Sequence, residues 1–145
     1  MTSPARLTLR LGNDHAEIAR VTAAVERHVA GSELEPRLAY AVELALDELV
    51  TNVVSYGYAP GTSGQIEVTL AVEKDSVTLT VADDGHPYDP LRAHEPPLTE
   101  PLDTRRIGGL GVHLVRSLMD EFGYRREGGR NIVTCMLARG AEAIE

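Results

Sequence analysis

Lysine is almost absent from this chain of 145 residues, whose fourteen basic side chains are thirteen arginines and the single lysine Lys74. A phosphate-binding loop of the G-x-x-x-x-G-K-[ST] type requires a lysine directly after its last glycine, whereas Lys74 follows Glu73. The lysine of eukaryotic-type protein kinases accompanies a glycine-rich loop, and no such loop surrounds Lys74. The sequence therefore excludes both lysine-dependent nucleotide sites.

Acidic residues outnumber basic ones, and aromatic residues and cysteine are scarce. The net charge of −8 argues against a protein that binds nucleic acid by neutralising phosphates. With 4% aromatic residues and no tryptophan, a base-stacking platform is also unexpected. The single cysteine, Cys135, lies in an apolar run, which predicts a buried thiol. No apolar stretch approaches the roughly 18 residues of a membrane span. We therefore expect a cytoplasmic protein that binds neither nucleic acid nor a membrane.

The length matches one domain of about 150 residues, so we expect residues 1–145 to form a single unit. Alternating apolar residues predict five strands, at 6–11, 66–72, 77–81, 122–126 and 131–137. Apolar residues at helical spacing predict helices at 14–31, at 36–56 and from Gly108 onward. The proline-rich segment 86–107 has a length typical of a functional lid or of a disordered loop. This order predicts an α+β fold: a two-layer α/β sandwich with helices on one face of a mixed, largely antiparallel sheet.

Glu48 and Asn52 lie four residues apart in the second predicted helix, so they share one helix face. Small residues on the same face (Ala41, Ala45 and Ser55) predict that both polar groups are half-buried beside a cavity. Burying such groups without partners is costly, and a hydrated Mg²⁺ with phosphate oxygens would satisfy both. A solvated glutamate and a helix-capping asparagine are the alternative interpretation.

Asp83 continues the row of Val77, Leu79 and Val81, so the strand pleat directs its carboxylate toward the core. A buried carboxylate needs a partner, and an exocyclic amine is one candidate. Gly85, two residues later, would let the backbone approach a ligand closely. The alternative is an Asx turn that ends the strand.

The run Gly108-Gly109-Leu110-Gly111 directly precedes the third predicted helix. Glycines let the chain pass close to phosphates, and a helix N-terminus presents free N–H groups with a partial positive charge. Such a site binds an anion without a lysine. A hinge between loop and helix is the alternative. The dinucleotide fingerprint does not apply, since it needs a βαβ unit and this helix is followed by a hairpin.

Together these features resemble the GHKL (Bergerat-fold) ATPase superfamily, and within it the small anti-sigma factor serine kinases of the RsbW and SpoIIAB type. The similarity extends over essentially the whole chain. The segments that carry it are 43–52 (ELALDELVTN), 81–85 (VADDG) and 107–115 (IGGLGVHLV).

The resemblance implies a role for each matching residue. Glu48 would be the catalytic general base, and Asn52 would bind Mg²⁺. Asp83 would accept a hydrogen bond from the adenine amino group, and backbone N–H groups at Gly109 and Gly111 would contact the phosphates. The implied ATP-binding residues are Asn52, Asp83, Gly85, Tyr88, Gly108, Gly109, Gly111 and Val112.

Some positions depart from the family pattern. Pro87 replaces a glycine that relatives often carry, and Tyr88 is then expected to line the base pocket. Asn131 stands where relatives often have a threonine near the adenine, and the resemblance assigns it no role. Arg105 and Arg106, at the end of the predicted lid, could neutralise phosphate charge or form a solvated basic pair.

The resemblance implies an ATP- and Mg²⁺-dependent serine/threonine protein kinase that is also an anti-sigma factor. It would bind a sigma factor and phosphorylate an anti-anti-sigma antagonist. It would act as a homodimer, with the first strand and helix at the interface. The alternative is a non-catalytic ATP-binding module that sequesters a protein partner.

Overall fold

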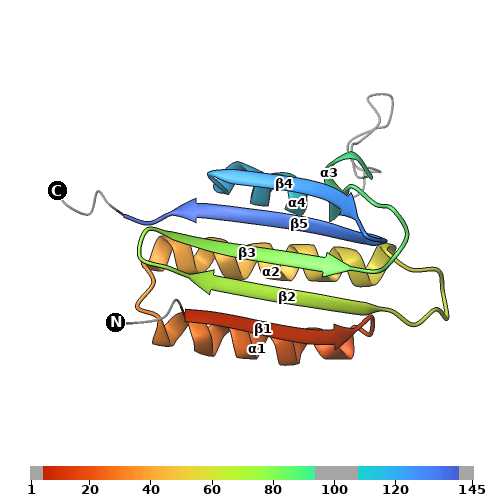
Figure 1. Ribbon diagram of the computed structural model, residues 1–145, viewed down its shortest axis with the longest axis horizontal. Helices are drawn as coiled ribbons and strands as arrows, with labels where there is room; N and C mark the ends of the chain where they lie inside the picture. The colour runs from red at the N-terminus through yellow and green to blue at the C-terminus, as the bar shows by residue number, and fades with distance from the viewer. Residues whose placement is uncertain (1–4, 94–107, 141–145) are drawn as a thin grey trace.

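A computed structural model describes residues 5–93 and 108–140 of the chain (Figure 1). The strands are β1 (Ala5–Gly12), β2 (Gln65–Val72), β3 (Ser76–Asp83), β4 (Glu121–Glu127) and β5 (Arg130–Ala138). The helices are α1 (Ala16–Gly31), α2 (Pro36–Tyr56), α3 (Pro90–Ala93) and α4 (Gly108–Leu118). All five predicted strands and all three predicted helices are present, with bounds that differ by a few residues.

The strands form one sheet in the order β1-β2-β3-β5-β4, and each neighbouring pair is antiparallel. Figure 1 shows α1, α2 and α4 on the same face of this sheet, with α2 behind its centre. The structure therefore confirms the predicted two-layer α+β sandwich. It sharpens the expected mixed sheet to an antiparallel one in the described residues.

The register of the sheet determines which side chains meet beneath the helices. Val68, Val81 and Val133 lie opposite one another on β2, β3 and β5, and all three are buried. Two residues further along the same face, Asp83 of β3 lies opposite Asn131 of β5. Because inward positions alternate along each strand, this polar pair ends an otherwise apolar layer. The pair lies at the end of the sheet where α2 also ends.

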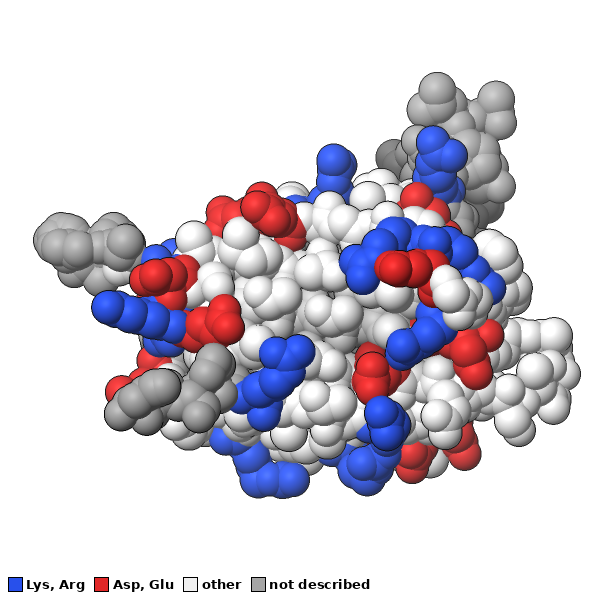
Figure 2. All heavy atoms as spheres, viewed as in Figure 1, with Lys and Arg blue, Asp and Glu red and all other residues white. Residues whose placement is uncertain are grey.

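The other face of the sheet is not covered by the helices. Thr69, Thr80 and Thr134 face one another there on adjacent strands. Figure 2 shows uncharged atoms over the middle of this face and charged side chains mostly toward its edges. None of the described helices is both long and apolar enough to cross a membrane.

Two local details differ from the predictions. Helix α1 begins at Ala16, and Asp14 lies before it, where its carboxylate accepts a hydrogen bond from the N–H of Ala16 at 3.0 Å. The short helix α3 lies inside the predicted lid. Asp89 caps its first turn by accepting a hydrogen bond from the N–H of Leu91. The remainder of the lid, 94–107 with Arg105 and Arg106, lies outside the described residues.

Candidate nucleotide site

Helix α2 positions Glu48 and Asn52. Its apolar side buries Leu49 and Val53, so the polar residue that precedes each of them is held at the edge of the core. Asn52 is only 5% exposed and Glu48 is half-buried. Burial, with a smaller effect from the charge of Asp47, raises the pKa of the Glu48 carboxyl. The two polar groups therefore lie on one helix face as predicted, but only Glu48 is half-buried, because Asn52 is buried.

Gly111 in the first turns of α4 lies directly against Glu48. A Cβ atom at position 111 would overlap Oε1 of Glu48, so this contact requires glycine. Gly108 and Gly109 form the start of the same helix, whose first N–H groups have no intrahelical acceptor. Val112, the next residue, is fully buried and anchors the turn in the core. The glycine run thus places the N-terminus of α4 beside Glu48, the candidate general base.

Asp83 ends β3 and is 4% exposed. Its Oδ1 accepts hydrogen bonds from the N–H of Gly85 at 2.8 Å and from Nδ2 of Asn131 at 2.9 Å. Burial raises the pKa of the Asp83 carboxyl, although both hydrogen bonds act in the opposite direction. Oδ2 accepts no hydrogen bond from any residue that the structure describes.

The loop after β3 is held against the end of α2. A Cβ atom at Gly85 would overlap the carbonyl oxygen of Gly57, and the N–H of His86 donates to that same oxygen at 3.1 Å. From β4, Nη1 of Arg126 donates to the carbonyl oxygen of Gly85 at 2.7 Å. These contacts fix the backbone beside Asp83 and explain the need for glycine there.

Asn131, to which the resemblance assigned no role, is a central residue of the site. It is 3% exposed, and its amide bonds to Asp83, to the carbonyl oxygen of His86 and to the N–H of Tyr88. The hydroxyl of Tyr124 also donates to Asn131 Oδ1, at 2.6 Å. The sequence did carry a signal for it, because Asn131 has the same strand parity as the inward-facing Val133.

Tyr88 lies in the cavity between α2 and the sheet. Its hydroxyl donates to Oδ1 of Asn52 at 3.3 Å, and its ring stacks with that of Tyr56 at a centroid distance of 6.3 Å. The space left in this cavity is about 10 Å³, roughly that of one water-sized sphere. The lining residues are Leu49, Asn52, Val53, Val81, Asp83, Tyr88, Pro90, Asn131 and Val133. The cavity thus brings Asn52, Asp83 and Tyr88 together, but in this conformation it has no room for a purine.

The donor set suits Mg²⁺ bound together with a nucleotide. Among the described residues, no three His, Cys, Asp or Glu side chains converge as a metal cage. Asn52 and Glu48 supply hard oxygen atoms on one helix face, and Mg²⁺ characteristically takes its remaining ligands from water and phosphates. The chain's only lysine, Lys74, lies in the turn before β3, at the opposite end of the strand from Asp83. A phosphate bound beside Glu48 would therefore need a partner other than lysine.

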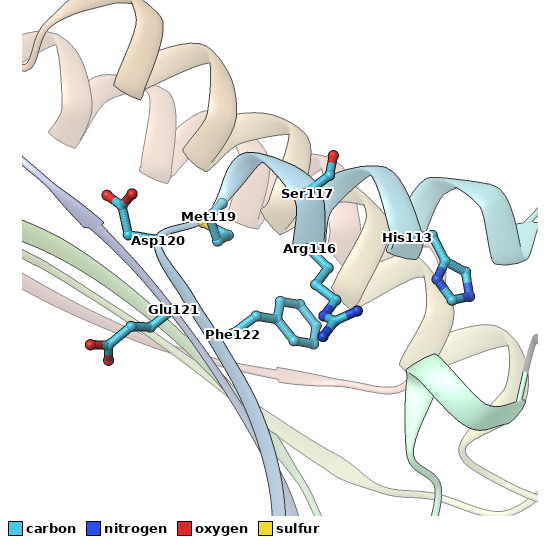
Figure 3. Close-up of a pocket in the computed structure, with 7 residues that line it drawn as sticks. All are labelled: His113, Arg116, Ser117, Met119, Asp120, Glu121 and Phe122. Carbon is cyan, nitrogen blue, oxygen red and sulfur yellow. The ribbon is translucent and has the colours of Figure 1, made fainter.

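A separate groove of about 550 Å³ lies between α4 and the start of β4 (Figure 3). Figure 3 shows the guanidinium of Arg116 beside the ring of Phe122, with Asp120 and Glu121 further along the groove. The lining residues are His113, Arg116, Ser117, Met119, Asp120, Glu121 and Phe122. None of the described candidate nucleotide ligands lines it, so it is not the predicted site.

Comparison with known proteins identifies the family. The model of the histidine kinase-like ATPase domain matches residues 11–137, which include every candidate site residue from Glu48 to Asn131. The chain belongs to the histidine kinase-like ATPase domain family. The GHKL-type fold expected from the sequence is therefore confirmed.

Curated relatives of this ATPase domain are protein kinases. The serine/threonine-protein kinase BtrW of Bordetella bronchiseptica is 39% identical over 98 residues, which span 68% of this chain and 69% of BtrW. The serine-protein kinase RsbW of Bacillus subtilis is 28% identical over 105 residues, which span 68% of this chain and 64% of RsbW. The ATPase domain is thus similar to serine kinases of the RsbW and BtrW kind.

A solved structure agrees with the fold. The RsbU and RsbW domains of a Mycobacterium tuberculosis protein superpose with a TM-score of 0.62 at 19% identity. The match covers 94% of this chain and 33% of that one. At this identity the similarity supports the arrangement of helices and strands alone.

Proposed function

We propose that this chain is an ATP-dependent serine/threonine protein kinase and anti-sigma factor, which binds a sigma factor and phosphorylates an anti-anti-sigma antagonist. The observation that carries the proposal is the placement of Glu48 against the glycine turn of α4, one helical turn from Asn52. Asn52 in turn shares a cavity with Asp83. These contacts support the proposal because they bring the proposed general base, the proposed metal ligand and the carboxylate proposed to bind adenine into one region of the fold.

Each residue has a part in this proposal. Mg·ATP, when bound, supplies the phosphoryl group. Asn52 offers its amide oxygen to the cation, and Asp83 offers Oδ2 to the adenine amino group. The N-terminus of α4 stabilises negative charge with its free N–H groups. Phosphoryl transfer depends mainly on such positioning and charge stabilisation.

Glu48 is the proposed general base. Its carboxylate would accept the proton of the acceptor hydroxyl on the antagonist. Burial raises its pKa, which makes the carboxylate more basic than an exposed glutamate. An anion at the N-terminus of α4 is also stabilised by the helix dipole, so the ionised form remains available.

The relatives support the kind of acceptor that we propose. BtrW and RsbW are serine or serine/threonine kinases by name, and we propose a serine or threonine of a protein antagonist as the acceptor here.

We also propose a cytoplasmic homodimer built from single domains of residues 1–145. Light scattering of the purified chain tests the dimer, and a mass of about 15.7 kDa would contradict it.

The kinase assignment is tested with γ-labelled ATP, Mg²⁺ and a candidate anti-anti-sigma protein. Glu48→Gln should bind ATP and lose transfer by about 100-fold or more, the size of a general-base contribution. The matched control is Glu43→Gln on the same helix. Glu43 is also half-buried, and burial also raises its pKa, but its charged neighbour is Glu26 of α1. Transfer that survives Glu48→Gln unchanged would refute the base assignment.

A non-catalytic ATP-binding module is the second candidate. It is favoured by the hydrogen bond from Tyr88 to Asn52, because the proposed metal ligand is already engaged by a side chain of the same protein. Retention of a protein partner that depends on Mg·ATP, without any transfer of label, would support this candidate over the kinase.

A further inference from the structure

Asn131 links the carboxylate of Asp83 to the first residues after β3. We propose that Asn131 is a positioning residue that sets the base preference of the nucleotide site, by presenting Asp83 as an acceptor to a 6-amino purine. The inference rests on the proposed function, since it requires that the cavity receives the base of a nucleotide. It concerns a residue that would not itself touch the phosphates or the metal.

The hydrogen-bond partners determine the orientation of the Asn131 amide. The N–H of Tyr88 can only donate, so the atom 3.1 Å from it is Oδ1. The carbonyl oxygen of His86 can only accept, so the atom 2.8 Å from it is Nδ2. The second proton of Nδ2 then goes to Asp83 Oδ1, and the Tyr124 hydroxyl donates to the second lone pair of Oδ1. All four hydrogen-bonding positions of the amide are used, so it cannot flip without losing several bonds.

With the amide in this orientation, the two carboxylate oxygens of Asp83 differ in their hydrogen bonds. Oδ1 receives two donors, from Gly85 and Asn131. Oδ2 accepts no hydrogen bond within the described residues, and Asp83 lines the cavity. An acceptor held in this way bonds to the amino group of adenine and opposes the carbonyl oxygen of a 6-oxo purine. A site built for one hydrogen bond rejects an analogue that cannot make it.

The charged groups around Asp83 do not replace Asn131. Arg126 of β4 attracts the carboxylate, but its guanidinium is exposed and bonds to the Gly85 carbonyl. Asp84 repels the carboxylate, and Tyr58 on the loop after α2 bonds to Asp84. From α2, the cavity receives only Asn52 and apolar side chains. Among these groups, Asn131 is the side chain that donates directly to Asp83.

The experiment compares the binding of ATP and ITP, which differ at C6 of the base, by calorimetry with Mg²⁺. The wild type should prefer ATP. Asn131→Asp keeps the size of the side chain and replaces the donor with an acceptor, so the ATP/ITP affinity ratio should fall about tenfold or more, the factor for a bond to a charged group. Ile132→Ala, on the opposite face of β5, is the control and should leave the ratio unchanged.

A second variant keeps the inference testable if Asn131→Asp does not fold. Tyr124→Phe removes the hydroxyl that bonds to Asn131 Oδ1 and keeps the half-buried ring, and it should lower the ratio about threefold. A wild-type preference for ATP that is unchanged in these variants overturns the role of Asn131 alone. A wild type that binds neither nucleotide overturns the proposed function as well.

Discussion

The hydroxyl of Tyr88 donates a hydrogen bond to Oδ1 of Asn52 at 3.3 Å, across 36 residues of sequence. The backbone of Tyr88 is held separately, by the bond from its N–H to Asn131. The tyrosine ring therefore fills the cavity in which a base is expected, while its main chain is anchored at the rim. A nucleotide bound as proposed would have to displace the ring and the hydrogen bond to the Asn52 oxygen.

Tyr88→Phe should tighten Mg·ATP binding. The substitution removes the hydroxyl that occupies Asn52 and keeps the ring, so the dissociation constant should fall about threefold, in line with one neutral hydrogen bond. Calorimetry measures the change. Tyr40→Phe, at a position on α2 that is 64% exposed, is the control. Weaker binding by Tyr88→Phe would instead indicate that the hydroxyl contacts the nucleotide.

Gly111→Ala should leave the fold intact and impair phosphoryl transfer by at least about tenfold. The new methyl group meets the end of the Glu48 side chain, which is flexible, so the carboxylate is displaced while the backbone of α4 remains in place. Transfer of label and the melting temperature are measured together. Gly123→Ala on β4 is the matched control, since no atom lies within 4 Å of its added Cβ. Full activity in Gly111→Ala would show that the Glu48 position is not required.

Asp83→Asn should stabilise the fold at pH 7 while it weakens ATP binding. Burial raises the folded-state pKa of Asp83 above its unfolded value near 3.9. The ionised group therefore opposes folding, and native stability is lost as pH rises from the unfolded toward the folded pKa, by about 1.4 kcal/mol per unit of difference. Urea unfolding at pH 4 and pH 7 should show a gain in the variant that grows with pH.

Asp84→Asn serves as the control, because it should change the stability of the fold in the opposite direction. Hydrogen bonds from the N–H of Gln65 and from the Tyr58 hydroxyl lower the pKa of the Asp84 carboxyl. Its stabilising effect is present above the unfolded pKa and is lost as pH falls, so Asp84→Asn should destabilise the fold at pH 7 and have less effect at pH 4. The same sign for both variants would contradict this interpretation of the two carboxylates.

Cys135 should resist alkylation in the native protein. It lies in the core on β5, and burial raises the pKa of its thiol to about 12. The thiolate is the reactive form, so iodoacetamide at pH 8 should modify the chain only after urea unfolds it. Mass spectrometry measures the modification. Rapid labelling of the folded chain would mean that β5 opens locally.

The elements of the fold were predictable because each depends on a local pattern. The alternation along β2 and β3 predicted two strands and directed Asp83 inward, and the structure has both. The spacing of Glu48 and Asn52 needed only helix geometry. Helix α3 was not predicted, because it has four residues and lies within a proline-rich segment.

Local patterns in the sequence were enough to predict the helices and strands and the inward direction of Asp83, and to exclude lysine-dependent nucleotide sites. Which distant groups meet depends on the folded chain: Asn131 meets Asp83 across 48 residues, and Tyr88 meets Asn52. Periodicity assigns a side chain to a face, whereas the register of β5 against β3 comes from the packing of the whole sheet. The scarcity of lysine, visible in the sequence, leaves phosphate binding to other groups, and the structure places the N-terminus of α4 beside Glu48.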